Sequence, residues 1–131
     1  MITGANTVEY KESPKKTTSV SVPGSVTIKG VKYQVTSIAP KAFKNNKKLK
    51  KIIIPASVKS IGKEAYYGCK NLQSIIIKTK LLTTKSVGKN AFRKAGSKNY
   101  KKLVVKVPKS KKKSYTKLLR KKGLSSAAKI K

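Results

Sequence analysis

The chain has 131 residues, the size of a single domain, and its hydrophobic share of 37% allows only a modest core. Its 34 basic residues face three acidic ones, so the formal net charge is +31, and it contains no histidine. Because aspartate is also absent, acid/base pairs, catalytic triads, zinc sites and calcium loops cannot be assembled. We therefore expect no enzyme, no catalytic residue, no metal and no cofactor.

The basic residues are almost all lysine, since only Arg93 and Arg120 are arginine. Lysine is a hydrated point charge, whereas the planar arginine side chain reads phosphates and guanine edges with two hydrogen bonds. The composition favours diffuse attraction to teichoic acids, acidic glycans, anionic membranes or nucleic acid over base-specific recognition. Salt should weaken that attraction.

Residues 1–18 form a polar N-terminal segment that lacks the basic and apolar regions of a signal peptide. We expect this segment to be partly disordered or to add an edge strand near Val8 to Tyr10. No run of about 18 apolar residues occurs, so no transmembrane segment is predicted. The chain is then either an intracellular protein or a segment of a longer chain.

Residues 19–131 are predicted to form one domain, which begins with an N-terminal cap over residues 19–38. The stretch SVSVP places Val20 and Val22 two residues apart, as inward-facing strand residues require. A β-hairpin that turns at Lys29-Gly30 follows and leads into the first repeat.

Residues 35–107 contain three similar segments, which begin at Val35, Val58 and Thr84. A Ser-Ile or Ser-Val marker and an Ala-aromatic pair recur in each segment with steps of 23 and 26 residues. An apolar triplet follows, and the third copy carries two extra residues around Gly96 to Lys98. The sequence predicts about three repeats of 23–28 residues, which stack because one copy alone cannot bury its apolar face.

The apolar residues of each repeat divide into a strand side and a turn side. On the strand side the matched sets are Leu49, Ile52 and Ile54, then Leu72, Ile75 and Ile77, then Tyr100, Leu103 and Val105. On the turn side, Phe43, Tyr66 and Phe92 predict a stacked core, each on one turn of α or 3₁₀ helix. Beside that core, Cys69 is expected to be a buried structural thiol, because no partner would lower its pKa.

Residues 108–131 depart from the repeat and predict a C-terminal β-α-β cap. Tyr115, Leu118 and Leu119 have helical spacing, with Ser110 as N-cap and Gly123 as the C-terminal stop. Leu124 is placed to contact Leu119 in a Schellman arrangement, and the final AKIK is expected to return as a strand. The predicted fold is thus α/β, a short solenoid with a β-hairpin cap at one end and this cap at the other.

The repeat pattern Leu-x-x-Ile-x-Ile-Pro, Val-x-x-Ile-Gly and Ala-Phe/Tyr-x-x-Cys resembles that of the BspA-like leucine-rich repeat family of bacterial cell-surface proteins. Residues 58–77 match it most closely, whereas the first copy has Ala39 for glycine and Asn46 for cysteine. The resemblance covers roughly Val20 to Val107. It implies a leucine-rich-repeat solenoid, secreted or attached to the wall, that takes part in adhesion and protein binding without catalysis.

The outward positions of the predicted strands form a candidate binding face. If Ile52 and Ile54 point inward, Ile53 points outward, and an apolar ladder with a lysine rim results. The predicted face consists of Lys51, Ile53, Ser74, Ile76, Lys102 and Val104. Tyr67 breaks the register of the aromatic core and is a further candidate for an exposed contact. The alternative for the ladder is that β-branched residues only favour the strand and stack on one another.

Two hypotheses of function follow, and a third is structural. In the first, the chain is an extracellular or cell-surface adhesion module that binds a protein or an anionic wall or glycan polymer, as a monomer or as part of a longer chain. In the second, it is a small intracellular basic protein that coats nucleic acid without specificity. In the third, it is a spacer or cap whose charge reflects solubility. The scarcity of arginine, the interior aromatic residues and the family resemblance favour the first.

Overall fold

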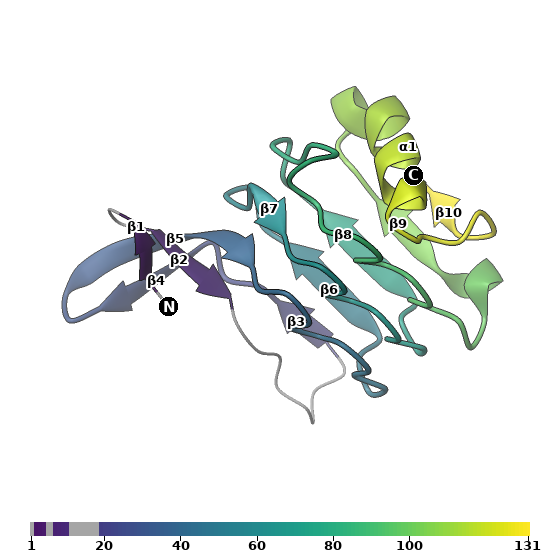
Figure 1. Ribbon diagram of the computed structural model, residues 1–131, viewed down its shortest axis with the longest axis horizontal. Coiled ribbons are helices and arrows are strands. Elements are labelled where there is room, and N and C mark those ends of the chain that lie inside the picture. The colour runs from purple at the N-terminus through teal and green to yellow at the C-terminus, as the bar shows by residue number, and fades with distance from the viewer. Residues whose placement is uncertain (1, 5–6, 11–18) are drawn as a thin grey trace.

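The computed structural model describes residues 2–4, 7–10 and 19–131, which fold into a curved stack of short strands closed at one end by a helix (Figure 1). The predicted disorder before residue 19 concerns mainly residues outside these ranges. The strands are β1 (Ile2–Gly4), β2 (Thr7–Tyr10), β3 (Ser19–Ser21), β4 (Ser25–Ile28), β5 (Val31–Ile38), β6 (Lys51–Ile54), β7 (Ser60–Ile61), β8 (Ser74–Ile77), β9 (Val104–Lys106) and β10 (Lys129–Ile130). The helices are η1 (Tyr100–Lys102), η2 (Lys109–Lys111) and α1 (Lys112–Lys121).

One side of the stack is a parallel sheet with the strand order β10-β9-β8-β6-β3. Ile52 pairs with Val20 on one side and with Ile75 on the other, so the strand-side residues of successive repeats lie in register. Their side chains are fully buried and form the strand half of the core. Val20 therefore occupies the place of Ile52 in the preceding coil and is buried, as predicted for an inward-facing strand residue.

The third repeat differs from the predicted alignment. Ile38 and Ile52 are 14 positions apart, as are Ile61 and Ile75, whereas Val87 lies 18 positions before Val105, which pairs with Ile75. The third coil therefore has four extra residues, not two. The predicted strand-side set of the third repeat was Tyr100, Leu103 and Val105. Tyr100 instead lies half-buried in η1, and the buried residues here are Leu103, Val105 and Val107.

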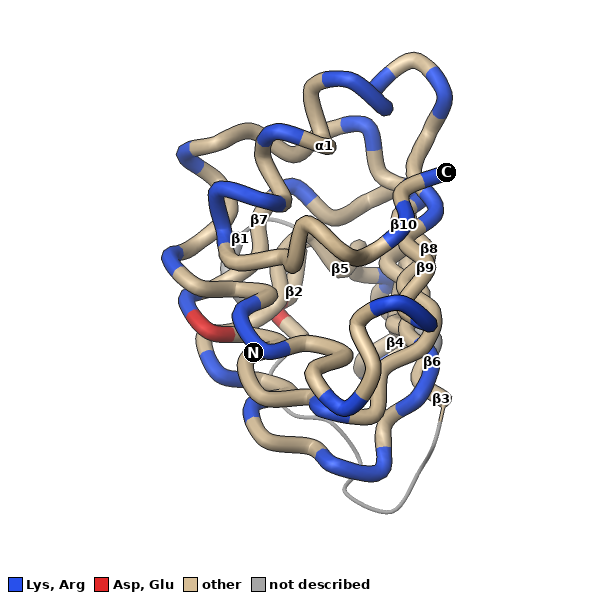
Figure 2. Tube along the Cα trace, turned by 90° about the vertical axis from the view of Figure 1, so that its right-hand side faces the viewer, with Lys and Arg blue, Asp and Glu red and all other residues tan. Residues whose placement is uncertain are grey.

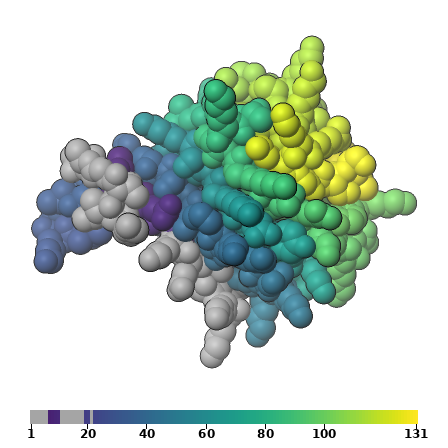
Figure 3. Space-filling model, viewed as in Figure 1, coloured from purple at the N-terminus to yellow at the C-terminus, as the bar shows by residue number. Residues whose placement is uncertain are grey.

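A second sheet, with the order β1-β2-β5-β4, extends from the N-terminal end of the stack. The β4–β5 hairpin turns at Lys29 (φ 49°) and Gly30 (φ 81°), as predicted, because a two-residue turn with two positive φ angles matches the twist of the strands. This hairpin projects from the body of the molecule (Figure 3). The predicted strand at Val8 to Tyr10 is present as β2, but it lies between β1 and β5 and is not an edge strand.

On the turn side of the stack, the Ala-aromatic pairs lie in hydrogen-bonded turns instead of the predicted single turns of helix. Lys41 and Asn45 have φ angles near +60°, which prevents a helix from continuing. Their N–H groups, and that of Phe43 between them, donate to carbonyl groups of the next coil. We call this set of bonds between coils the turn ladder: from Lys41 to Lys63, Phe43 to Ala65, Asn45 to Tyr67, Glu64 to Lys89, Tyr66 to Ala91 and Gly68 to Arg93, over 2.7–3.1 Å.

Between the turn ladder and the parallel sheet lies a row of stacked rings. The ring centroids of Tyr10, Phe43, Tyr66 and Phe92 follow one another at 5.5, 4.9 and 5.3 Å, and the rings are within 15° of parallel. The predicted core of three aromatic residues is confirmed. Tyr10 extends it by one ring, which the sequence did not indicate because the N-terminal segment lacks the repeat pattern.

Helix α1 packs on the last coil by burying Tyr115, Leu118 and Leu119. The Tyr115 hydroxyl accepts a hydrogen bond from the Leu82 N–H (3.1 Å) and donates one to the Thr79 carbonyl (2.9 Å). β10 then runs parallel to β9. The helix therefore lies against one coil, and its return strand extends the parallel sheet.

The ends of α1 differ in how well they were predicted. Ser110 is not the N-cap, because it lies in η2, and Lys111 precedes α1 without a side-chain capping bond. At the other end, Leu124 N–H donates to Leu119 O (3.0 Å) and Gly123 N–H to Arg120 O (3.2 Å). These two bonds are the Schellman pattern that the sequence indicated.

The substitution Tyr66→Phe is expected to stabilise the protein. The Tyr66 hydroxyl is buried and has no hydrogen-bond partner within the described part of the chain, and phenylalanine occupies the equivalent positions 43 and 92. Removing an unsatisfied buried hydroxyl should raise the free energy of unfolding by about 1 kcal/mol, measured by urea denaturation at pH 7. Tyr115→Phe is the matched control, since its hydroxyl makes two bonds and the change should cost about 1 kcal/mol. A loss of stability in Tyr66→Phe would contradict this account.

Candidate binding surface

The solvent side of the parallel sheet carries two rows of side chains, which we call the strand face. The first row follows the register Ser19, Lys51, Ser74, Val104, Lys129. The second row follows Ile53, Ile76 and Lys106. Because residues two apart on a strand share a face, both rows point away from the buried row of Ile52, Ile75 and Val105.

The structure changes the composition of the predicted face at its C-terminal end. Val104 is in β9 but pairs with Ser74, so it does not continue the row of Ile53 and Ile76, and Lys106 takes that place. Lys102 is not a strand residue, since it ends η1. Lys106 was missed because the apolar triplet of the third repeat was aligned two residues too early.

The strand face combines a small apolar centre with cationic surroundings. Ile53, Ile76 and Val104 are each half-buried, and Lys51 and Lys106 beside them are exposed. None of the residues named in either row is acidic. The face can therefore offer apolar contact and positive charge together.

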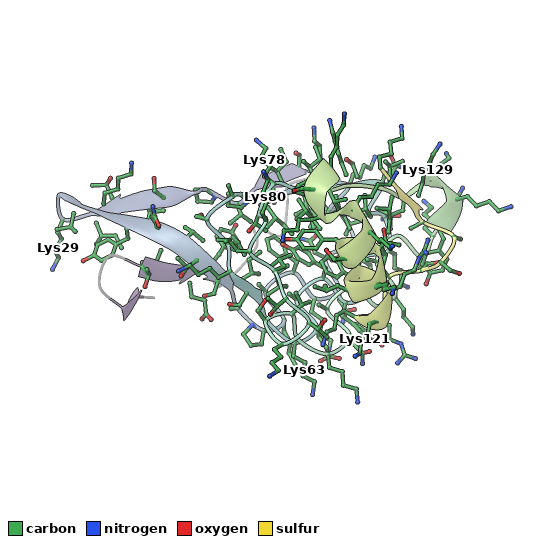
Figure 4. All side chains as sticks on the ribbon, turned by 90° about the horizontal axis from the view of Figure 1, so that it is seen from above. Lys29, Lys63, Lys78, Lys80, Lys121 and Lys129 are labelled. Atoms are coloured by element: carbon green, nitrogen blue, oxygen red, sulfur yellow. The ribbon has the colours of Figure 1, made fainter. Side chains whose placement is uncertain are left out.

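Lysine is not confined to the strand face. Figure 2 shows basic residues around the whole trace, and in Figure 4 Lys78 and Lys80 project on the opposite side from Lys63 and Lys121. Within the described ranges one ion pair is present, between Lys44 Nζ and Glu64 Oε1 at 3.3 Å. The positive field is thus spread over the molecule, and charge alone does not mark a site.

Tyr67 lies on the turn side, opposite the strand face, and is half-buried. Its ring has Lys44 Nζ at 5.2 Å and Lys94 Nζ at 5.9 Å from the centroid, so two ammonium groups from the coils on either side contact it. The structure does not bring Tyr67 together with the other predicted residues. A contact role for it stays a prediction.

Cys69 lies beneath the aromatic stack and is fully buried. Its Sγ donates a hydrogen bond to the Phe43 carbonyl at 2.9 Å. Burial raises the pKa of the thiol to about 12, and a backbone hydrogen bond at Asn46 opposes this shift. These properties agree with the structural role predicted for Cys69.

Two further observations bear on the class of protein. Across residues 2–4, 7–10 and 19–131, no cluster of three or more cysteine or acidic side chains is placed to hold a metal ion. In those same ranges, no helix has the length and apolar character needed to cross a bilayer.

Successive short parallel strands on one side, turns on the other and a buried Ile/Leu/Val row between them define a leucine-rich-repeat solenoid. A family model described as BspA type leucine rich repeat region (6 copies) matches residues 15–121. That match spans most of the chain, and the protein belongs to the BspA-type leucine-rich repeat family.

Solved structures share this fold. A leucine rich cell surface protein from Faecalibacterium prausnitzii A2-165 matches with 23% identity and a TM-score of 0.64, over 80% of this chain and 27% of that one. A leucine-rich repeat protein from Bacteroides capillosus matches with 24% identity and a TM-score of 0.60, over 83% and 76% of the two chains. The chain thus spans about a quarter of the F. prausnitzii protein. A comparison with the curated proteins found no match.

Proposed function

We propose that this protein is a non-catalytic cell-surface module that binds a protein or an anionic polymer through its strand face. The observation that carries the proposal is the half-buried group of Ile53, Ile76 and Val104 on the solvent side of the sheet, with exposed Lys51 and Lys106 beside it. In this arrangement the lysines attract a partner over a distance, and the apolar side chains add short-range affinity that salt does not screen.

The proposed location rests on the family. The F. prausnitzii structure is described as that of a cell surface protein, and this chain shares its fold. We place the protein outside the cell for that reason, as a monomer or as part of a longer chain. Nucleic-acid coating is less well supported, because the rings of Phe43, Tyr66 and Phe92 are buried in the stack and offer no surface for bases.

The ends of the solenoid fit a capping role. The β4–β5 hairpin extends the N-terminal sheet, and the unit β9–α1–β10 covers the last coil, where the Phe92 N–H donates to Lys122 O at 3.0 Å. We propose that these two units protect the exposed ends of the repeat core, so that residues 19–131 act as one domain.

The proposal is tested by binding measurements on lipoteichoic acid, heparin and duplex DNA across a salt series from 50 mM to 500 mM. Binding that is due only to charge should fall steeply with salt for all three ligands and be lost at the highest salt, because the release of counterions drives it. A true recognition surface leaves a salt-resistant component for one ligand class. Equal loss for all three would overturn the proposal.

The double substitution Ile53→Ser and Ile76→Ser should remove that salt-resistant component. Losing two half-buried apolar side chains is expected to weaken binding about thirtyfold, since each contributes roughly 1 kcal/mol at a contact. The control pair Thr83→Ser and Thr84→Ser lies on an exposed loop outside the strand face and should leave binding unchanged. Circular dichroism checks the fold, and unfolding of the double variant would show that these side chains belong to the core.

A further inference from the structure

A groove of about 500 Å³ opens at the edge of the solenoid where the chain enters the parallel sheet. Its lining is Lys50, Lys70, Asn71, Leu72, Gln73, Lys98, Asn99 and Lys102. These residues come from three successive coils: one lies just before β6, four just before β8, and three in the long loop and η1 that precede β9. The groove is separate from the apolar centre of the strand face.

The longer third coil builds one wall of the groove. Its four extra residues fall between Phe92 and Val105, the stretch that includes Lys98, Asn99 and Lys102. In the earlier coils the same interval is shorter, since Phe43 and Ile52, and likewise Tyr66 and Ile75, are nine positions apart. The insertion thus adds cationic and carboxamide side chains at a place where the other repeats have fewer residues.

Hydrogen bonds between coils hold the walls in place. Lys98 N–H donates to Lys70 O at 3.1 Å, which fixes these two lysines on adjacent coils. Gln73 N–H donates to Lys50 O at 2.8 Å and accepts, at its own carbonyl, the Val104 N–H at 3.0 Å. The Asn71 side-chain amide donates to Lys47 O. The backbone that carries the lining is therefore ordered before any ligand arrives.

The lining of the groove is cationic and polar. The lining contains four lysines and three residues with carboxamide side chains, and it contains no acidic and no aromatic residue. In the described part of the chain, the ion pair that involves a lysine is that of Lys44, so these four ammonium groups have no acidic partner there. An anion that enters the groove would relieve their mutual repulsion.

We infer that this groove is a binding site for an acidic polysaccharide, a sugar chain that bears carboxylate, sulfate or phosphate groups. Lysines bind the oxyanions, and the carboxamides of Gln73 and Asn99 can donate to and accept from the sugar hydroxyls. Nucleic acid is disfavoured, because the lining has no ring on which a base could stack. The volume falls in the range of small-ligand sites, so the groove holds a few sugar units of a longer chain. This inference rests on the proposed function for its ligand class.

The test measures the affinity of hexagalacturonate, a heparin hexasaccharide, a phosphorylated mannohexaose and oligo-dT at physiological salt. The groove variant carries Lys70→Gln, Lys98→Gln and Lys102→Gln. Its control carries Lys63→Gln, Lys89→Gln and Lys121→Gln, at exposed positions away from the groove, with the same net charge. We expect the groove variant to lose at least about tenfold in affinity for one of the three acidic oligosaccharides, and the control less than about threefold. The oligosaccharide most affected identifies the oxyanion.

A variant that keeps the net charge distinguishes specific binding in the groove from general attraction to the positive charge of the protein. Gln73→Ala with Asn99→Ala should weaken the same oligosaccharide about three- to tenfold, since hydrogen bonds to sugar hydroxyls are lost. Equal losses in both lysine variants, or no binding of any oligosaccharide, would overturn the inference. Equally tight and equally sensitive binding of oligo-dT would also overturn it, in favour of a general polyanion site. Loss of binding only in the Ile53→Ser and Ile76→Ser variant would reject the groove and keep the proposed function.

Discussion

Gly62→Ala is expected to unfold the protein or to lower its free energy of unfolding by about 3–5 kcal/mol. A Cβ atom at Gly62 would lie 2.3 Å from the Pro40 nitrogen and 2.6 Å from its Cα, in the coil below. Both neighbours are backbone atoms of a hydrogen-bonded turn, so no side chain can rotate away. The two coils would have to separate, and the stack that buries the core depends on their contact.

The equivalent glycine of the next coil, Gly88, should be equally intolerant of a side chain. Gly88→Ala would bring a Cβ to 2.3 Å from the Lys63 nitrogen. Gly24→Ala is the matched control, because its Cβ would meet Pro55 Cβ at 3.8 Å, an ordinary contact. Urea denaturation compares the three variants. Similar midpoints for Gly24→Ala and Gly62→Ala would show that the coils are not packed as closely as the structure has them.

Cys69 should react with iodoacetamide at pH 8 at least about a thousandfold more slowly in the native protein than in urea. With a pKa of about 12, about one thiol in ten thousand is ionised at that pH, compared with about one in ten for an unfolded thiol of pKa 9.0. Burial adds to the protection. Mass spectrometry of alkylated protein measures both rates, and rapid native labelling would refute the buried position.

The same pKa shift makes stability depend on pH in a definite direction. Below pH 9 the thiol is protonated in both states and contributes no pH dependence. Between pH 9 and 12 the unfolded chain releases the proton and the native state keeps it, so stability falls by up to about 1.4 kcal/mol per pH unit. Lysine deprotonation acts in the same range, so we compare with Cys69→Ala, which matches Ala95 of the third copy. As pH rises from 9 to 12, the free energy of unfolding of the wild-type protein should fall relative to that of Cys69→Ala.

Much of the fold could be predicted because the same spacing of apolar residues recurs in each repeat. The strand-side pairs Ile52/Ile54 and Ile75/Ile77 follow from a two-residue period, and the stack of aromatic residues follows from their equal spacing. The form of the turns could not be predicted. Lys41 and Asn45 adopt positive φ although they are not glycine, because the hydrogen bonds that hold them come from the next coil and not from neighbours in sequence.

The candidate surface was only partly predictable for a related reason. Ile53 and Ile76 were placed correctly, since their repeats have equal length. Lys102 and Val104 were assigned to the wrong positions, because the longer third coil moves the paired strand by two residues relative to the apolar triplet. The groove was not predicted from the sequence, because its lining residues come from three coils and share no motif within any one of them.

The turn ladder has a direction. Every N–H in it points toward the C-terminal end of the stack and every carbonyl toward the N-terminal end, so the peptide dipoles of successive coils add instead of cancelling. Its positive pole meets the carbonyl of Lys122, which lies at the negative end of α1. The end of the solenoid that presents N–H groups thus meets the end of the helix that presents carbonyl groups, which is the favourable orientation of the two dipoles. A transplanted helix that met the last coil with its amino end would present N–H to N–H, which makes the polarity of the solenoid a criterion for grafting new ends onto repeats of this type.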